Sequence, residues 1–317
     1  MVRLEFGVKT GQGGYSYEEL VKVWSAAEDL GFDSAWLYDH FVSLGDKNEP
    51  CLEGWVTLAA LAAVTRRLKI GTLVTCVSYR QPSLLAKMGA TVDQVSHGRL
   101  VMGLGAGWHQ EEYEEYGYTF PDQGTRMRQL KETLIIIKKM WTESKASYEG
   151  KFFQIHDAAC EPKPVQKPCP KMLVGIAKGK RTLPCLAVKY ADGFNVTASS
   201  LQECGEITNV TLQYAKTYGR KPSGLILSWQ GFITIGRTPS ELEQLTEIAA
   251  KRRGKTVAEF RKNAAERGYI IGQPDECTQR LRQFKDIGVN SFYLIFTGDT
   301  EIHPLETFRD EVIPQLR

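Results

Sequence analysis

An alternation of apolar strands with amphipathic helices runs through the chain and is the feature that most restricts its fold. Eight segments are predicted as strands, each followed by a helical segment: 4–9, 34–40, 68–76, 100–104, 172–177, 192–197, 225–235 and 291–296. The segment 68–76 is apolar almost throughout, which is typical of a strand buried on both faces in a parallel sheet. Repeated strand–helix units of this kind predict a (β/α)8 TIM barrel.

Two distant segments support a repeated unit because they share one order of residues. GFDSAWL at 31–37 and GVNSFYL at 288–294 each place a glycine, an apolar residue, Asp or Asn, and Ser at the start of a strand. An open, doubly wound sheet is the alternative. The chain lacks the G-x-G-x-x-G fingerprint with an acidic residue about 20 positions further on, so the barrel is the favoured prediction.

The length fits either two average domains or one large barrel, at 317 residues. We expect a single barrel domain over 1–317, with insertions at about 147–170 and 251–272. The first insertion carries four prolines between 162 and 170, which is typical of an inserted loop or hairpin. The second insertion has helical character.

Composition and charge exclude several classes of partner. Hydrophobic residues make up 42% and the net charge is +3 with both signs interspersed, so nothing indicates a nucleic acid or a membrane surface. No apolar run approaches the ~20 residues of a membrane span, and the start MVRLEFGVKT reads as a strand rather than a signal peptide. The seven scattered cysteines form no C-x-x-C pair, which argues against a disulfide framework and a zinc site. We therefore expect a cytoplasmic protein without a metal.

The segment RLVMGLGAGWHQEEYEEYGY at 99–118 joins a glycine-spaced strand end to a cluster of aromatic and titratable residues. Gly103, Gly105 and Gly107 stand at every second position and so clear one side of a strand, where a flat ring or a phosphate can approach. A tight strand-to-helix turn is the alternative explanation of the glycines. The residues that follow favour a site, because barrel enzymes carry their chemistry at the carboxyl ends of strands.

His40 is the main acid–base candidate, because histidine titrates near neutrality and this one ends a predicted strand. Asp39 is expected either to orient the imidazole or to hold a cofactor group. Cys76 has no neighbouring base in the sequence, so a packed, unreactive cysteine is the favoured interpretation. Glu111 and Glu112 begin a helix, where acidic residues are common, and the favoured interpretation gives them no further role.

A basic turn after the predicted strand 172–177 is the candidate phosphate site. Lys178, Lys180 and Arg181 precede a helix. Backbone N–H groups at a helix start suit a phosphate, and cationic side chains add charge-assisted hydrogen bonds. A solvated basic turn is the alternative.

Several segments together resemble the luciferase-like monooxygenase superfamily, and most closely its single-chain deazaflavin (coenzyme F420)-dependent oxidoreductases. They are GFDSAWLYDHF at 31–41, TLAALAAVTRRLKIGTLVT at 57–75, LLAKMGATVDQVSHGRLVMGLGAGWHQEEYEEYGY at 84–118, YEGKFFQ at 148–154, PKPVQ at 162–166 and YADGFN at 190–195. The resemblance covers nearly the whole chain. It implies a bacterial-luciferase-like TIM barrel that binds F420, or alternatively FMN, at its carboxyl-terminal mouth.

The resemblance also implies roles for individual residues. His40 is implied as the catalytic acid or base in hydride transfer between F420 and a small organic substrate. The implied cofactor-binding residues are Asp39, Leu73, Val74, Thr75, Gly105, Gly107, Trp108, Gly175, Ile176, Ala177 and Lys178. A cis peptide bond between Leu73 and Val74, beneath the cofactor ring, is implied as well.

Two departures from the family pattern restrict what carries over. Some sugar-phosphate-oxidising relatives have a catalytic glutamate where this chain has Trp108, which argues against sugar-phosphate oxidation. Ile176 and Ala177 replace a run of glycines, which shifts the expected phosphate position. The alternative functions are an FMN-dependent monooxygenase and a non-catalytic flavin-binding protein. The expected partner is a small-molecule substrate, with a homodimer as an open alternative to a monomer.

Overall fold

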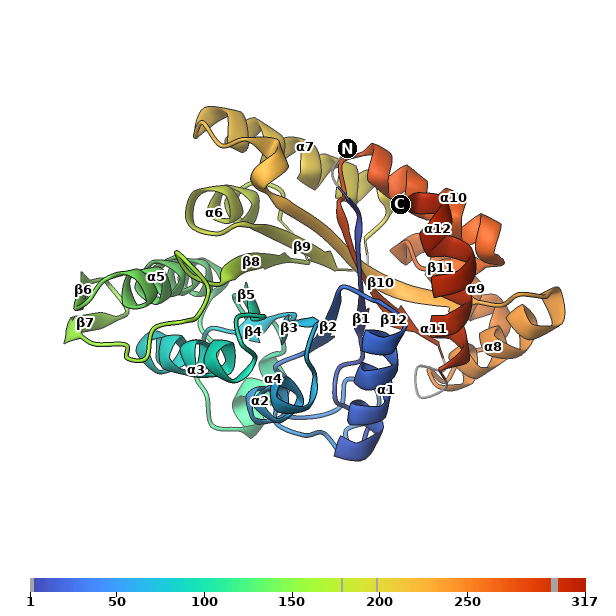
Figure 1. Ribbon diagram of the computed structural model, residues 1–317, viewed down its shortest axis with the longest axis horizontal. Helices are drawn as coiled ribbons and strands as arrows, with labels where there is room; N and C mark the ends of the chain where they lie inside the picture. The colour runs from blue at the N-terminus through green and yellow to red at the C-terminus, as the bar shows by residue number, and fades with distance from the viewer. Residues whose placement is uncertain (1–2, 178, 198, 298–301) are drawn as a thin grey trace.

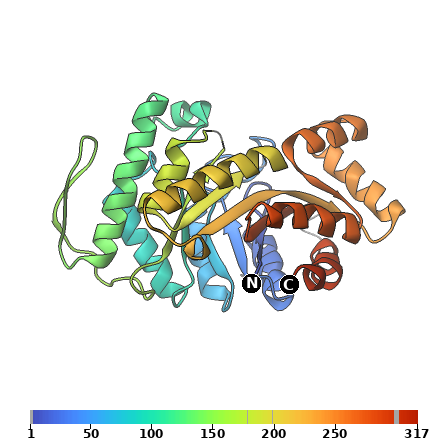
Figure 2. The same cartoon turned by 90° about the horizontal axis from the view of Figure 1, so that it is seen from above.

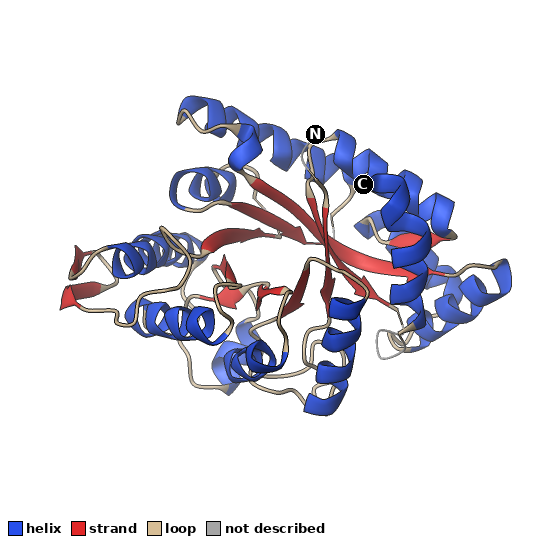
Figure 3. Ribbon diagram, in the orientation of Figure 1, coloured by secondary structure: helices blue, strands red, loops and turns tan. Residues whose placement is uncertain are grey.

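The computed structural model describes residues 3–177, 179–197, 199–297 and 302–317. In these residues eight parallel strands form a barrel with helices on its outside, as Figure 1 and Figure 3 show. The strands are β1 (Glu5–Lys9), β2 (Ser34–Leu37), β3 (Lys69–Thr72), β5 (Val101–Gly105), β8 (Lys171–Ile176), β9 (Gly193–Thr197), β10 (Ile226–Ile235) and β12 (Ser291–Phe296). The predicted (β/α)8 TIM barrel is confirmed.

Backbone pairing connects the barrel strands in the order β3, β2, β1, β12, β10, β9, β8 and β5. A parallel bridge between Ile70 and Leu100 joins β3 to β5 and closes the ring. A short strand, β4 (Thr75–Cys76), follows β3 and pairs with β5. The peptide bond between Leu73 and Val74, in the gap between β3 and β4, is cis, which confirms the prediction.

The helices pack around the barrel because their apolar faces cover the outward side chains of the strands. They are α1 (Tyr17–Asp29), α2 (Gly54–Val64), α3 (Pro82–Val95), α4 (Gln110–Glu115), α5 (Gln123–Thr142), α6 (Thr182–Tyr190), α7 (Leu201–Thr217), α8 (Pro239–Lys251), α9 (Val257–Arg267), α10 (Pro274–Asp286), α11 (His303–Thr307) and α12 (Ile313–Leu316), with short helical turns at Pro222–Gly224 and Phe308–Val312. Ser16 begins α1 through a capping box with Glu19. Residues at helical spacing then bury one face of α1: Leu20, Val23, Trp24 and Ala27.

The inside of the barrel is filled by side chains that alternate along the strands. Trp36, Leu73, Val101, Leu173 and Tyr293 form a buried cluster there. The rings of Trp36 and Tyr293 lie 4.5 Å apart at its centre. A packed interior of this kind is the rule in TIM barrels, so ligands are expected at an end of the barrel rather than along its axis.

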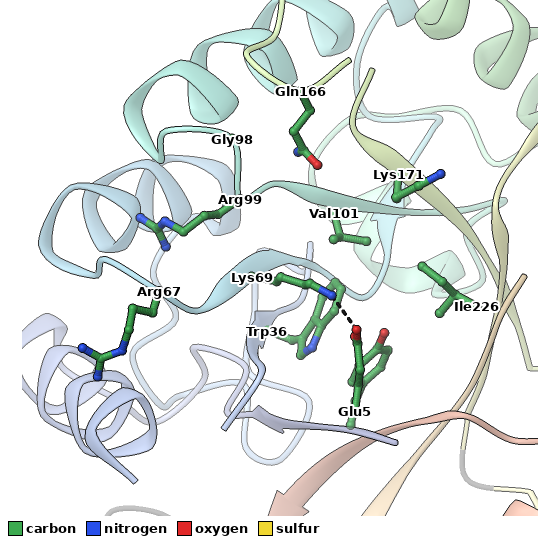
Figure 4. A pocket seen from close by; sticks show the side chains of 11 residues that line it. Glu5, Trp36, Arg67, Lys69, Gly98, Arg99, Val101, Gln166, Lys171 and Ile226 are labelled. Atoms are coloured by element: carbon green, nitrogen blue, oxygen red, sulfur yellow. Dashed lines mark hydrogen bonds and ion pairs between the residues drawn. The ribbon is translucent and has the colours of Figure 1, made fainter. Parts of the chain in front are cut away.

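A cavity of about 280 Å³ lies at the amino-terminal ends of the strands (Figure 4). Lys69 and Glu5 form an ion pair at 2.5 Å on its wall, drawn as a dashed line in Figure 4. Arg99 donates to backbone carbonyls of α2 and of the segment that follows it. These charges bind protein groups and join elements, which is the structural role expected at this end of a barrel.

The two segments that the sequence predicts as insertions lie at opposite ends of the molecule in Figure 2. The first is an antiparallel hairpin of β6 (Ala146–Glu149) and β7 (Gln154–Ala158). The second follows α8, contains α9 and leads into β11 (Ile270–Gly272), which pairs with the end of β10. No helix in the described ranges is long and apolar enough to span a membrane.

Candidate active site

The carboxyl ends of the strands bring together many of the residues that the sequence singles out. The rings of His40, after β2, and Trp108, after β5, lie 5.6 Å apart. Asp39 accepts a hydrogen bond at 2.9 Å from the backbone N–H of Cys76 at the end of β4. The contacts connect three neighbouring strand ends into one candidate site at the end of the barrel where TIM-barrel enzymes carry their chemistry.

His40 is held by a buried carboxylate from α4. Its Nδ1 lies 2.8 Å from Oε2 of Glu112, whose side chain is 0% exposed against 15% for His40. An ionised carboxylate can only accept a hydrogen bond, so Nδ1 carries the proton of this bond. The other ring nitrogen, Nε2, is therefore the one left for a substrate.

Further donors converge on Glu112 and keep it charged. It accepts hydrogen bonds from the backbone N–H of Phe41 at 2.7 Å and from the hydroxyl of Tyr79 at 2.7 Å. Burial alone disfavours the charge of Glu112, but the hydrogen bond and charge of His40, together with these donors, outweigh burial and lower its pKa to about 2. The carboxylate thus stays ionised at neutral pH and accepts the hydrogen bond from Nδ1 of His40.

Glu112 is the functional candidate that the sequence interpretation misses. Glu111 and Glu112 stand side by side at a helix start and look equivalent in the sequence. In the structure Glu111 is exposed and binds Lys47 at 3.0 Å, whereas Glu112 is buried. The contact of Glu112 with His40, 72 positions away in the chain, distinguishes Glu112 from Glu111, and a single sequence contains no signal for this contact.

Asp39 binds Arg80 and not the imidazole of His40. Arg80 donates two hydrogen bonds to its carboxylate, at 2.7 and 2.9 Å, and a third to Glu53 at 2.6 Å. Burial raises the pKa of Asp39 to about 6 against the opposing effects of Arg80 and the Cys76 N–H. The expectation that Asp39 orients the imidazole is therefore wrong for the described structure, because Arg80 occupies the Asp39 carboxylate and Glu112 takes the imidazole.

Val74 fills the space beside the glycines of β5 and β8. A Cβ built on Gly175 would lie 2.8 Å from Val74 Cγ1, and one built on Gly105 would overlap Cγ2. A Cβ on Gly103 would overlap the carbonyl oxygen of Thr72. The glycines thus leave room for Val74 and for the backbone of Thr72, and the space beside them is filled by the protein itself.

The residues on either side of Val74 are buried more deeply than Val74 itself. Leu73 packs in the cluster inside the barrel. Thr75 is fully buried, with its hydroxyl 2.5 Å from the hydroxyl of Thr72. Of these three predicted cofactor contacts, Val74 is the one whose side chain is partly exposed.

Gly107 and Cys76 surround the hydroxyl of a buried tyrosine. A Cβ on Gly107, whose φ is +81°, would overlap the Tyr113 hydroxyl. The Cys76 sulfur lies 2.9 Å from the same hydroxyl oxygen. Burial raises the pKa of Cys76 to about 12, so the thiol stays protonated and suits the interpretation as a packed residue.

Trp108 borders the site with much of its indole open to solvent. The residue is 62% exposed, and its ring lies 4.9 Å from that of His109. His109 caps α4, because its Nδ1 accepts a hydrogen bond from the Glu112 N–H at 3.2 Å. The start of α4 thus places Trp108 next to the His40–Glu112 pair.

The loop after β8 leads into a cationic cavity. Gly175 is half-buried, Ile176 buried and Ala177 exposed, while Lys178 lies outside the described residues. A cavity of about 760 Å³ opens between the first turns of α5 and α6, and its cationic lining residues are Arg128, Lys131, Lys180 and Arg181. Both helices begin near the carboxyl ends of the strands that precede them, so this cavity lies at the rim of the mouth.

The barrel with its site at the carboxyl ends of the strands places the chain in the class of TIM-barrel enzymes. The model of the luciferase-like monooxygenase family matches residues 1–291. The chain therefore belongs to the luciferase-like monooxygenase family.

Similar proteins extend over almost the full length of the chain. An F420-dependent glucose-6-phosphate dehydrogenase from Amycolatopsis mediterranei (strain U-32) is 25% identical over 338 residues, covering 99% of each chain. A solved F420-dependent secondary alcohol dehydrogenase, in complex with an F420-acetone adduct, has a TM-score of 0.84 at 21% identity and 99% coverage of both chains. A monooxygenase from Streptomyces bottropensis has a TM-score of 0.86 at 21% identity, covering 99% of this chain and 100% of its own. The two structures show that the fold is shared.

Proposed function

We propose that this protein transfers a hydride between coenzyme F420 and a small organic substrate. The observation that carries the proposal is the position of a proton-holding pair, His40 and Glu112, at the same end of the barrel as the cationic cavity. Full-length similarity to a protein named as an F420-dependent dehydrogenase supports it. In this proposal the whole chain is one catalytic domain, with insertions at about 147–170, which includes most of the β6–β7 hairpin, and at 251–272, which includes α9 and β11.

The residues at the mouth of the barrel fit a cofactor that has a flat ring and an acidic tail. Val74 offers a partly exposed apolar surface just after β3. The end of β8 is followed by the start of α6, where backbone N–H groups favour a phosphate. The cationic cavity suits the acidic tail of F420. The proposed contacts are Asp39, Leu73, Val74, Thr75, Gly105, Gly107, Trp108, Gly175, Ile176, Ala177 and Lys178.

His40 is the proposed proton donor or acceptor. F420, when bound, supplies hydride transfer at a ring carbon and reacts poorly with oxygen. Glu112 fixes the imidazole through Nδ1, which leaves Nε2 to exchange a proton with the substrate. Trp108 covers one side of the pair and reduces the access of water to it.

Titration of the purified protein with F420 and with FMN, followed by fluorescence, tests the cofactor. We expect F420 to bind at least about tenfold more tightly than FMN, because its longer acidic tail reaches more of the cations in the cavity. Micromolar binding of FMN without measurable binding of F420 would instead identify an FMN-dependent enzyme.

A further inference from the structure

The rim of the mouth beside His40 is aromatic. Trp108 is 62% exposed and lies 5.6 Å from His40, ring to ring. Phe41 and Tyr116 continue this rim with ring centroids 4.5 Å apart, and Tyr116 is exposed as well. An indole left open to solvent beside a proton donor offers a flat apolar face to a ligand.

The same side of the mouth is acidic. The segment 110–115, which forms α4, contains four glutamates. Glu112 is committed to His40, and Glu111 and Glu115 both bind Lys47, at 3.0 and 2.8 Å. The three exposed carboxylates, Glu111, Glu114 and Glu115, outnumber the one lysine and give this wall a negative charge, which disfavours an anionic substrate.

Cations near this wall are engaged by protein groups. Arg80 binds Asp39 at 2.7 Å and Glu53 at 2.6 Å. Four exposed cations line the cavity between α5 and α6, which the proposed function assigns to the cofactor, and one of them, Lys180, is ion-paired with Glu206. A phosphate on the substrate would have to compete with the acidic cofactor for these cations.

We propose that the substrate is an uncharged, flat, conjugated carbonyl compound that stacks on Trp108 with its oxygen toward His40. This inference rests on the proposed function. The acidic wall and the engaged cations require a substrate without negative charge, and the exposed indole requires a flat one. The proton held by His40 requires an oxygen that can receive it.

The chemistry balances for an α,β-unsaturated ketone and reduced F420. The β-carbon of the substrate receives the hydride, the carbon–carbon double bond is lost, and the carbonyl oxygen takes the proton of His40. The resulting enol then returns to the saturated ketone. Loss of the hydride and of one ring proton leaves the cofactor oxidised. The ring proton goes to solvent, and His40 takes one proton back from solvent, so the protons balance.

Steady-state oxidation of reduced F420 by benzylideneacetone tests the proposal, with glucose 6-phosphate and oxidised F420 as the comparison. We expect turnover of the enone and none of the sugar phosphate. Trp108→Ala should raise KM for benzylideneacetone about tenfold or more with a smaller change in kcat, whereas Trp108→Phe should stay near the wild type, because the flat face is retained. Tyr218→Ala, at an exposed aromatic residue after α7, is the matched control and should change neither constant.

Equilibrium dialysis supplies a readout that does not depend on turnover. The protein loaded with oxidised F420 cannot reduce benzylideneacetone, so its dissociation constant measures binding without turnover. With both proteins held at saturating F420, Trp108→Ala should raise this constant about tenfold. Oxidation of glucose 6-phosphate, absence of enone turnover by the F420-loaded protein, or unchanged KM and dissociation constant in Trp108→Ala would each overturn the inference. Failure of F420 to bind at all would overturn the proposed function instead.

Discussion

In the proposed proton transfer, His40 exchanges the proton with the substrate and Glu112 holds the His40 ring in place. His40→Ala removes the exchanging group, so we expect kcat to fall by about 10²-fold or more. The affinity for F420, measured by fluorescence titration, should change little, because the cationic cavity is untouched. An unchanged kcat would remove His40 from the mechanism.

Glu112→Gln keeps the size of the side chain and an acceptor for the Phe41 N–H, but removes the charge next to the imidazole. We expect kcat to fall about tenfold or more, as for other residues that orient a functional histidine. Glu111→Gln is the matched control on the same helix, and equal effects of the two variants would contradict the assigned role.

Lys9 is a buried lysine at the end of β1, and it bonds to Gln230 at 3.0 Å. Burial lowers the pKa of Lys9 from 10.5 to about 7. Between these values the unfolded chain binds more protons than the folded one, so the contribution of Lys9 to the free energy of unfolding rises with pH across this window. Lys9→Met should therefore stabilise the protein at pH 7 by roughly 1–3 kcal/mol, and less as the pH approaches 10. Urea unfolding across this range measures it, and a pH-independent difference would contradict it.

The elements of the barrel are predictable where apolar periodicity is strong. All eight strands follow from runs of apolar residues bounded by glycine and polar residues, and Ser16 and Thr238 begin helices as caps. The break between β3 and β4 does not follow from the pattern, because 68–76 is apolar almost throughout and looks like one strand. Only the family resemblance placed the cis bond there.

Because Val74 packs against the neighbouring glycines, substitutions at these glycines should change the stability of the protein. Gly105→Ala places a methyl group against the Val74 side chain, so we expect a loss of roughly 1–3 kcal/mol of stability. Val74→Ala should relieve much of this loss in the double variant, because the clash is between side chains. Gly103→Ala is the comparison: its new methyl meets the backbone carbonyl of Thr72, and Val74→Ala should not rescue it. Equal rescue of both variants in thermal unfolding would contradict this packing.

At the scale of the whole molecule, topology brings the candidate site together and the sequence shows only part of it. His40 and Trp108 are predictable because each follows a strand, and parallel strands in a barrel end at one face. Glu112 and Arg80 are not predictable, because their roles depend on which distant strand end each one meets. The separation of an acidic wall at α4 from a cationic cavity at α5 and α6 appears only when the chain is folded, since the net charge of +3 hides it.

This separation of charge predicts that the cationic cavity binds the acidic tail of the cofactor and not its ring. Lys131→Gln combined with Arg181→Gln removes two of the cations that line the cavity, so we expect F420 to bind about tenfold more weakly. A deazaflavin without the phosphate and acidic tail should bind both proteins equally, because it does not reach these cations. Added salt should weaken F420 binding to the wild type more steeply than to the double variant. Lys216→Gln combined with Lys221→Gln removes the same charge near the far end of α7 and should change none of these affinities. If both double variants lower F420 affinity equally, the effect comes from net charge, and the cavity does not hold the tail.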